Sequence, residues 1–421
     1  MDFSYDGIID EHLQTYANLI VDIGANVQEG QPVVLNCPVQ AYEFAEKLTL
    51  AAYNRGASDV AVFWHNEDID RMRFEYAPME TFKTVPDWVY DRMEYYYKKN
   101  VAIIGISSNM PDIFEGLDGE KLMVSSKAYA EKMKPLDHYT MNDEVSWCIA
   151  AYPNPEWAMK VYPEIGTYEE AYRKLWDDIL DFCYAKNPTP ELAWKNHIRV
   201  LENRAKTLNE YQFESVHYKN SLGTDLEVRL PKNHIWLAAK SENAKGTSFI
   251  PNMPTEEVFT APDRCGVNGK LVATKPLSYN GQLIEDFMFT FKDGKVVDFD
   301  VKKGGQALKS LLEHDEGARM LGEIALVPYE SPISLSNTLF YNTLFDENAS
   351  CHFAFGACYP TCIEGGVDLS TEDLKKRGGN DSSLHVDFMV GSKDLSIVGK
   401  THDGKEVAIF KDGNFAPEFS I

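Results

Sequence analysis

The stretch "PVVLNCPVQAYEFAEKLTLAAYNRGASDVAVFW" (Pro32–Trp64) places two short apolar runs on either side of an amphipathic segment. The runs at 32–37 and 59–64 are mainly apolar, which is typical of strands that are covered on both faces. Between them, apolar residues recur at helical spacing over residues 40–57, and Gly56 is expected to end that helix. The stretch therefore predicts a strand, a helix and a second strand, which together form the unit of a parallel sheet.

The same alternation continues on both sides of this unit. Residues 11–30 ("EHLQTYANLIVDIGANVQEG") show helical spacing, and Gly30 is expected to cap that helix. A helical pattern at 85–99 leads into a third apolar run at 101–107 ("VAIIGIS"). With right-handed crossovers, these elements predict a doubly wound α/β domain. No GxGxxG sequence follows any of these strands, so a dinucleotide site is not favoured.

The second half of the chain has a different character, which begins after two helical patterns within residues 155–210. From Phe213 onward, alternating segments and turn signals predict antiparallel strands, with one helix near 304–321. The predicted fold is thus α/β plus α+β, with an α/β domain at 1–210 and a β-rich domain at 211–421. The expected hairpin covers 215–231, and the expected turns are Asn280-Gly281, Asp293-Gly294, Asp403-Gly404 and Asp412-Gly413.

Composition limits the possible partners. The 421 residues are 44% hydrophobic and carry a formal net charge of −24. An acidic chain repels phosphate backbones and anionic lipids, so neither nucleic acid nor a membrane surface is expected as a partner. The acidity also fits an ordinary soluble protein. No apolar run approaches the ~18 residues of a membrane span, and seven cysteines without a secretion signal predict reduced thiols and a cytoplasmic location.

His385 and Asp387, in "SSLHVDFMVG", are the first candidates for chemistry. Side chains alternate across a strand, so these two are expected to lie on the same face. An imidazole beside a carboxylate is a natural pair of ligands for a divalent metal. The alternative is a histidine hydrogen-bonded to an aspartate on a solvated face.

A second candidate stretch is "FDENASCHFAFGACYPTC", residues 345–362. Glu347 and His352 in it are candidate metal ligands, although either could cap a turn. Cys351, next to His352, raises the alternative of a thiol nucleophile. However, a free cysteine is usually a small buried hydrophobe, and Cys358-x3-Cys362 does not match a structural zinc site.

Two further segments supply carboxylates. Glu256 and Glu257 open a short extended piece in "NMPTEEVFTAP", where one is expected to face the site and the other to face away. Glu323 lies near the front of the apolar strand "LGEIALVP", where a carboxylate needs either a cation or solvent as its partner.

The motifs together resemble a known family. "NMPTEEVFTAP", "GEIALVP", "TLFDENASCHFAFGACYP" and "HVDFMVG" occur in this order, and "NLIVDIGANVQEGQPVVLNCPV" precedes them. Over essentially the whole chain, the sequence is similar to the thermophilic-type aminopeptidases, the aminopeptidase T/S group of dinuclear metallopeptidases.

The resemblance implies a metal-dependent aminopeptidase that releases N-terminal amino acids from short peptides, using a water activated by two divalent ions. The ions would be Zn, Co or Mn, and Glu257, Glu323 and Tyr359 would have catalytic roles. The resemblance also implies a homodimer with an enclosed cavity in the β-rich domain. The implied metal ligands are Glu257, Glu323, Glu347, His352, Tyr359, His385 and Asp387.

The residue types suit this chemistry. Bridging carboxylates offset the charge of two neighbouring cations, and histidines favour transition metals over Mg or Ca. Two rival functions remain open, a dinuclear phosphoesterase and a binding protein with a structural metal. A phosphoesterase needs cationic groups, and no basic cluster lies near the motifs apart from "LKKRGG". A closed structural site is usually rich in cysteine and histidine. The helical zinc proteases are excluded, because the sequence contains no HExxH.

Overall fold

A computed structural model describes residues 7–108, 110, 112–279 and 282–419. The chain divides into two compact units, Met1–Asn196 with Lys240–Pro254, and His197–Ala239 with Thr255–Ile421. The segment Lys240–Pro254 thus returns to the first unit after the chain has entered the second. The division at residue 210 that the sequence suggests stays a prediction about domains.

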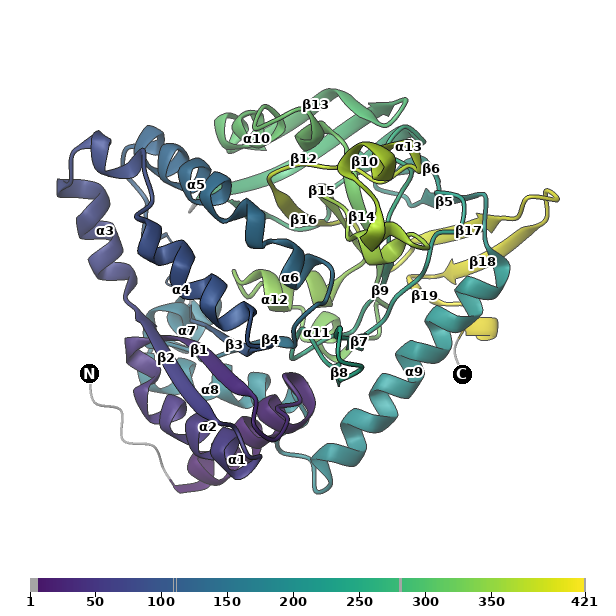
Figure 1. The fold of residues 1–421 in the computed structure, drawn as a ribbon. Helices are drawn as coiled ribbons and strands as arrows, with labels where there is room; N and C mark the ends of the chain where they lie inside the picture. Colours follow the sequence, from purple (N-terminus) through teal and green to yellow (C-terminus); the bar gives the residue numbers. More distant parts are fainter. Residues whose placement is uncertain (1–6, 109, 111, 280–281, 420–421) are drawn as a thin grey trace. The chain divides into compact units, whose positions relative to one another are not determined.

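The first unit is built on a parallel sheet of four strands in the order β2-β1-β3-β4, seen at the purple and blue end of the ribbon (Figure 1). The three apolar runs form β1, β2 and β3 as predicted, but β2 lies at the edge of the sheet and none of its residues is buried, so it is not covered on both faces. The fourth strand was not foreseen, because "WCIAA" is too short to show a period. The strands are β1 (Pro32–Pro38), β2 (Asp59–His65), β3 (Ala102–Ser107) and β4 (Trp147–Ala151), with a separate small pair, β7 (Ser241–Glu242) and β8 (Ser248–Phe249).

Helices supply two cores around this sheet. In one, Val34 and Ile103 pack with Tyr97 of α4 and Tyr139 of α6. In the other, Phe44 of α2 stacks on Tyr16 of α1 and meets Trp176 of α8. The predicted α/β character is confirmed. The helices are α1 (Gly7–Leu19), α2 (Tyr42–Asn54), α3 (Glu67–Tyr76), α4 (Asp87–Tyr97), α5 (Gly119–Met133), α6 (His138–Met141), α7 (Pro155–Val161) and α8 (Tyr168–Phe182), whereas α9 (Pro190–Tyr211) passes into the second unit at His197.

The prediction that the first helix runs to Gly30 is wrong. Helix α1 ends at Leu19 and continues only as a π-helical turn, Ile20–Gly24. Beyond it, Val27 is buried although it is not helical. The apolar spacing in this part of the sequence therefore marks buried positions and not a continuing helix. Gly30 instead lies in a turn with φ +76°, where its N–H bonds to the carbonyl of Gly56. Gly56 follows the end of α2 as predicted.

The second unit contains two antiparallel sheets. The larger runs in the order β11-β12-β10-β6-β5-β17-β18-β19, with β13 paired to β12, and the smaller in the order β16-β15-β14-β9. The hairpin of β5 and β6 and the three turns at Asp-Gly pairs are confirmed, whereas Asn280-Gly281 lies outside the described residues. The strands of the larger sheet are β5 (Ser215–Lys219), β6 (Asp225–Arg229), β10 (Val267–Val272), β11 (Leu277–Tyr279), β12 (Gln282–Lys292), β13 (Lys295–Lys303), β17 (Ser396–Lys400), β18 (Glu406–Lys411) and β19 (Asn414–Phe415).

The helix expected near 304–321 is shorter than predicted. Helix α10 (Gly305–Leu312) ends early, and beyond its end the Asp315 carboxylate accepts the backbone N–H groups of Gly317 and Ala318. The smaller sheet consists of β9 (Val258–Thr260), β14 (Leu321–Leu326), β15 (His352–Gly356) and β16 (His385–Met389), and the remaining short helices are α11 (Pro332–Leu335), α12 (Thr343–Asp346) and α13 (Thr371–Lys376).

An aromatic core joins the two sheets of the second unit. Phe355 of β15 stacks on Phe388 of β16 with 4.8 Å between ring centroids. Phe289 of β12 makes a T-shaped contact with each of these rings, with 5.0 Å and 5.4 Å between ring centroids. These rings occupy one face of the smaller sheet and anchor it to the larger one, which leaves the opposite face for other side chains.

Candidate metal centre

The opposite face of the smaller sheet carries the polar candidates. Glu323 on β14 pairs with Ala354 on β15, and Ala354 pairs with Asp387 on β16. Residues directly opposite one another in a sheet share a face, so Glu323 and Asp387 project to the same side with a small alanine between them. His352 lies two residues before Ala354 and His385 two before Asp387, which places both histidines on that face as well.

A β-bulge in β14 directs the Glu323 side chain to the polar face of the smaller sheet. Leu321 pairs with Phe355, yet Glu323 pairs with Ala354, so three residues of β14 span two of β15. Without the extra residue, Leu321 and Glu323 would share a face. The bulge instead turns Leu321 to the aromatic core and Glu323 to the polar side. Gly322 makes this possible, because a Cβ there would lie 2.3 Å from the carbonyl oxygen of Ala357.

The ligand atoms converge in two groups that share one residue. Glu257, Glu323 and His352 form the first group, and Glu323, His385 and Asp387 the second; within each, the atoms lie within 4.8 Å of one another. Glu323 Oε1 lies 4.0 Å from His352 Nε2, while its Oε2 lies 3.0 Å from His385 Nε2. One carboxylate therefore faces two histidines with different oxygens, as a bridging ligand would.

The remaining distances complete the two groups. Glu257 Oε2 lies 3.2 Å from His352 Nε2, and Asp387 Oδ1 lies 3.4 Å from His385 Nε2. The prediction that His385 and Asp387 lie on the same face is confirmed. Burial is nearly complete at His352, whose side chain is 1% exposed, whereas that of His385 is 21% exposed. The second group is therefore the one nearer to solvent.

Both imidazoles are held by their other nitrogen. His352 Nδ1 lies 3.0 Å from the carbonyl oxygen of Ser350, and His385 Nδ1 lies 2.8 Å from that of Ala357. A backbone carbonyl accepts a hydrogen bond from Nδ1–H, which keeps the proton on Nδ1 and leaves the Nε2 lone pair for a metal, the usual arrangement behind a metal-binding histidine.

Glu347 and Tyr359 border the two groups without belonging to either. Glu347 is buried beside Asn348, whose Nδ2 lies 3.4 Å from Glu347 Oε1. The Tyr359 ring packs 5.2 Å from the imidazole of His385, measured between centroids. Burial raises the pKa of Tyr359 well above its usual value, and the charges of Glu323 and other nearby carboxylates raise it further, so its hydroxyl keeps its proton.

Of the adjacent glutamates, Glu256 faces away from the two groups. Its Oε2 lies 3.8 Å from His197 Nε2. Burial raises the pKa of Glu256 to about 8, against the opposing charge of Arg204. Its backbone N–H is held by Asn348 Oδ1 at 2.7 Å. Sequence reasoning missed Asn348, because a single asparagine within a motif gives no signal of which distant segment it binds.

The electrostatics fit a site for cations. Burial raises the pKa of Glu347 well above its usual value, and the charges of Asp387 and Glu257 raise it further. Burial lowers the pKa of His352, but the hydrogen bond and charge of Glu257 outweigh this effect and bring the value to about 10. Negative charge is therefore in excess, and four carboxylates, those of Glu257, Glu323, Glu347 and Asp387, would match the four positive charges of two divalent ions.

The cysteines do not contribute to this geometry. All seven are free, and all except Cys265 are buried. Cys351 donates to the carbonyl of Val327, directly after β14, and burial raises the pKa of its thiol to about 12. The thiol therefore stays protonated near neutral pH and packs as a small hydrophobe.

Comparison with known proteins decides the family. The thermophilic metalloprotease family (M29) matches residues 9–415. The chain belongs to this family. It is therefore a metallopeptidase, a hydrolase of peptide bonds, and the resemblance found in the sequence motifs is confirmed. Among the residues described, no helix of this metallopeptidase combines the length and apolar character needed to cross a bilayer.

Relatives of this metallopeptidase match nearly end to end. Aminopeptidase AmpS of Bacillus subtilis is 44% identical over 406 residues, 96% of this chain and 98% of AmpS. Aminopeptidase PepS of Streptococcus thermophilus is 46% identical over 405 residues, 96% of this chain and 98% of PepS. The structure of wild-type AmpT from Thermus thermophilus matches with a TM-score of 0.90 at 36% identity, covering 97% of this chain and 100% of AmpT. This match confirms the predicted mixed fold.

Proposed function

We propose that this metallopeptidase is an aminopeptidase that removes N-terminal residues from short peptides at a centre of two divalent metal ions. The observation that carries the proposal is the position of Glu323, whose two oxygens face different histidines in two groups of ligands. The names of the full-length relatives, aminopeptidases AmpS and PepS, support the substrate class.

Each residue has a proposed part. Glu257, Glu323 and His352 would hold one ion, and Glu323, His385 and Asp387 would hold the other, so Glu323 belongs to both groups. Glu347 completes the negative charge around them. Zn, Co and Mn all accept this mixture of oxygen and nitrogen ligands. When bound, two such ions polarise a carbonyl and lower the pKa of water toward ~7.

The protein groups then handle the protons. Glu257 or Glu323, with their oxygens inside the cluster, would accept the proton of the attacking water. Tyr359 keeps its hydroxyl proton and lies beside His385, so it would donate a hydrogen bond to the oxyanion of the tetrahedral intermediate. A donor already held in position costs little reorganisation during the reaction.

The charge around the centre favours an amide substrate over a phosphate ester. The charged neighbours that most strongly shift the pKa values of Glu347 and Tyr359 are carboxylates and a histidine. A phosphate would need additional cationic groups there, since it brings further negative charge. The homodimer, the enclosed cavity and the cytoplasmic location belong to the same proposal and remain predictions.

The test combines metal content with hydrolysis. Native protein should contain about two metal ions per chain by mass spectrometry and should hydrolyse leucyl-amide but not an aryl phosphate. His385→Ala should lose metal, and its kcat should fall by on the order of 10²-fold or more, because even partners behind a ligand are worth ~10–100-fold.

His217→Ala is the matched control. His217 also pairs with an aspartate on a strand, with 2.6 Å between its Nε2 and Asp225 Oδ1, but this pair is exposed on the larger sheet. The control should keep both its metal and its activity. Activity that survives both His385→Ala and exhaustive chelation would exclude the metal mechanism.

A further inference from the structure

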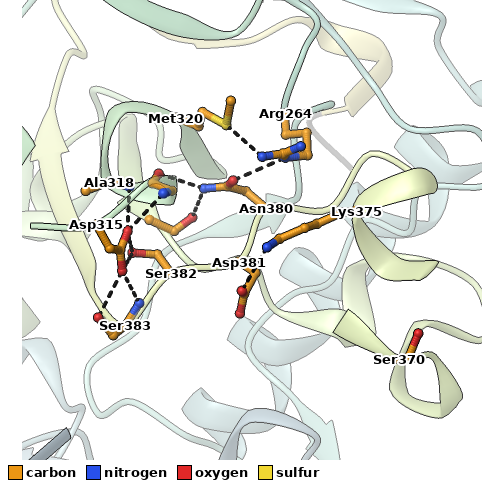
Figure 2. A network of polar contacts seen from close by, with 12 residues as sticks. Arg264, Asp315, Ala318, Met320, Ser370, Lys375, Asn380, Asp381, Ser382 and Ser383 are labelled. Carbon is orange, nitrogen blue, oxygen red and sulfur yellow. Dashed lines mark hydrogen bonds and ion pairs between the residues drawn. The ribbon is translucent and has the colours of Figure 1, made fainter. Parts of the chain in front are cut away.

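Asn380 is a buried side chain outside the candidate ligand set, and every polar atom of its amide is engaged. It is 1% exposed. Its Nδ2 donates to the carbonyl oxygens of Gly356 at 2.7 Å and Gly317 at 2.9 Å, and its Oδ1 accepts from Arg264 Nε at 3.4 Å (Figure 2). Its backbone carbonyl accepts the N–H of Cys358 at 2.9 Å. One residue thereby fixes three separate segments.

The segment 356–358 connects these bonds to the metal centre. Gly356 ends β15 and is the register partner of His385. Ala357 supplies the carbonyl that holds His385 Nδ1, and Cys358 directly precedes Tyr359. Asn380 therefore binds this three-residue segment at both ends, one on each side of the carbonyl that orients His385.

Asp315 makes a second cross-link of the same kind. Its carboxylate accepts from the hydroxyl of Ser382 at 2.8 Å and from the N–H of Ser383 at 2.7 Å, in the approach to β16 (Figure 2). The same carboxylate accepts the N–H groups of Gly317 and Ala318 ahead of β14, each at 2.9 Å. The two strands that carry Glu323 and the His385–Asp387 pair are thus tied together where they begin.

The backbone segments at Gly317 and Asp381 are in very close contact. A Cβ on Gly317 would lie 2.0 Å from the carbonyl oxygen of Asp381, which is closer than any real contact. Packing this tight transmits a displacement rather than absorbing it. Moving the segment around Asn380 would therefore move the Ala357 carbonyl and the start of β16 as well.

We propose that Asn380, supported by Asp315, is a positioning residue for the metal centre: it holds the segment 356–358 so that the Ala357 carbonyl orients the His385 imidazole and Tyr359 lies beside it. This inference rests on the proposed function, since it assigns a purpose to the geometry of that same site. The hydrogen bonds of Asn380 described above go to none of the candidate ligands, so it would act only through residues 356–359.

The test replaces the amide by an isosteric carboxylate. In Asn380→Asp, an oxygen that cannot donate faces the carbonyls of Gly317 and Gly356. Affinity for Zn or Co, measured by chelator competition, should fall ~10–100-fold. The visible absorption spectrum of the cobalt-loaded protein should shift, because the imidazole of His385 is no longer held in one orientation. With leucyl-amide, kcat should fall while KM changes little.

Asn243→Asp is the matched control, since Asn243 is also a buried asparagine whose side chain binds Ser146 Oγ and two backbone N–H groups. It lies in the first compact unit, whereas all the candidate ligands lie in the second. This control should lose thermal stability but keep its metal affinity and cobalt spectrum. If Asn380→Asp does not fold, Asp315→Asn provides the same measurements with a milder loss.

The outcomes separate the two proposals. If the native protein binds no metal or hydrolyses the amide without it, the proposed function fails. If the native protein is metal-dependent but Asn380→Asp matches Asn243→Asp in affinity, spectrum and kcat, only the positioning role is overturned. A selective loss of metal affinity with a changed cobalt spectrum would support that role.

Discussion

Glu323 shows how one side chain can define a site. Its carboxylate is buried near the middle of a sheet, where an isolated charge would be strongly unfavourable. Two histidines face its two oxygens, and two further carboxylates lie close by. When these carboxylates are all ionised, the cluster carries an excess of negative charge. That charge is unfavourable in a buried site unless cations or protons balance it.

Cys351 provides a test at the residue scale. We expect Cys351→Ala to retain kcat/KM within about twofold and to lose about 1 kcal/mol of unfolding free energy, because a small buried group is removed. In the native protein, iodoacetamide should label Cys265, the exposed thiol, and leave Cys351 unmodified.

Cys265→Ala is the control for that experiment and should abolish the labelling without changing hydrolysis. Loss of activity in Cys351→Ala with the metal content unchanged would revive a thiol mechanism and count against the metal centre.

Strand β15 carries aromatic residues on one face and a candidate metal ligand on the other, because its side chains alternate. In "HFAFG", Phe353 and Phe355 lie on the aromatic side, whereas His352 and Ala354 lie on the side of the ligands. Phe353 packs 5.0 Å from Tyr218 of the larger sheet, measured between ring centroids. The strand thus fixes the ligand face by anchoring its other face in a rigid core.

The bulge in β14 yields a prediction at the element scale. Gly322→Ala should lower the free energy of unfolding by about 1–3 kcal/mol or more, because its Cβ would lie 2.3 Å and 2.4 Å from two carbonyl oxygens. Metal content should fall as well, since relief of the clash would turn Glu323 away. Denaturant unfolding and metal analysis measure both effects.

Gly119→Ala is the comparison for this variant, because no atom lies within 4 Å of the position of its Cβ. It should change stability by no more than about 0.5 kcal/mol. Equal stability and equal metal content in the two variants would show that the bulge does not aim Glu323.

At the scale of the whole molecule, the candidate ligands belong to one compact unit. They lie on β14, β15, β16 and the adjoining loops of the second unit, although the chain visits the first unit again at Lys240–Pro254. Metal binding should therefore stabilise the folded state of the second unit directly. A ligand at 100 times its Kd stabilises the state that binds it by about 2.7 kcal/mol.

Metal removal should consequently act unevenly along the chain. After chelation, we expect faster amide hydrogen exchange in β14, β15 and β16 and little change in β1 and β3. Adding Zn or Co back should restore protection, which controls for damage by the chelator. An equal increase in both units, or none in either, would contradict a metal centre located in the second.

The sequence alone determined a good part of this protein. Apolar runs and helical spacing predicted β1, α2, β2 and β3, because the pattern that marks each of these elements lies within its own residues. Strand alternation correctly placed His385 and Asp387 on the same face. Four ordered motifs correctly indicated the family, since chance rarely preserves both the residues and their order.

Only the tertiary structure decided the rest. No local pattern announces that Gly322 forms a bulge, that Glu323 faces two histidines, or that Asn380 binds three separate segments. Each of these features depends on a contact with a residue far away in the sequence. The local sequence pattern does not show which distant residue that is. Apolar spacing past Leu19 misled for the same reason, because burial of Val27 depends on what packs around it rather than on the helix period.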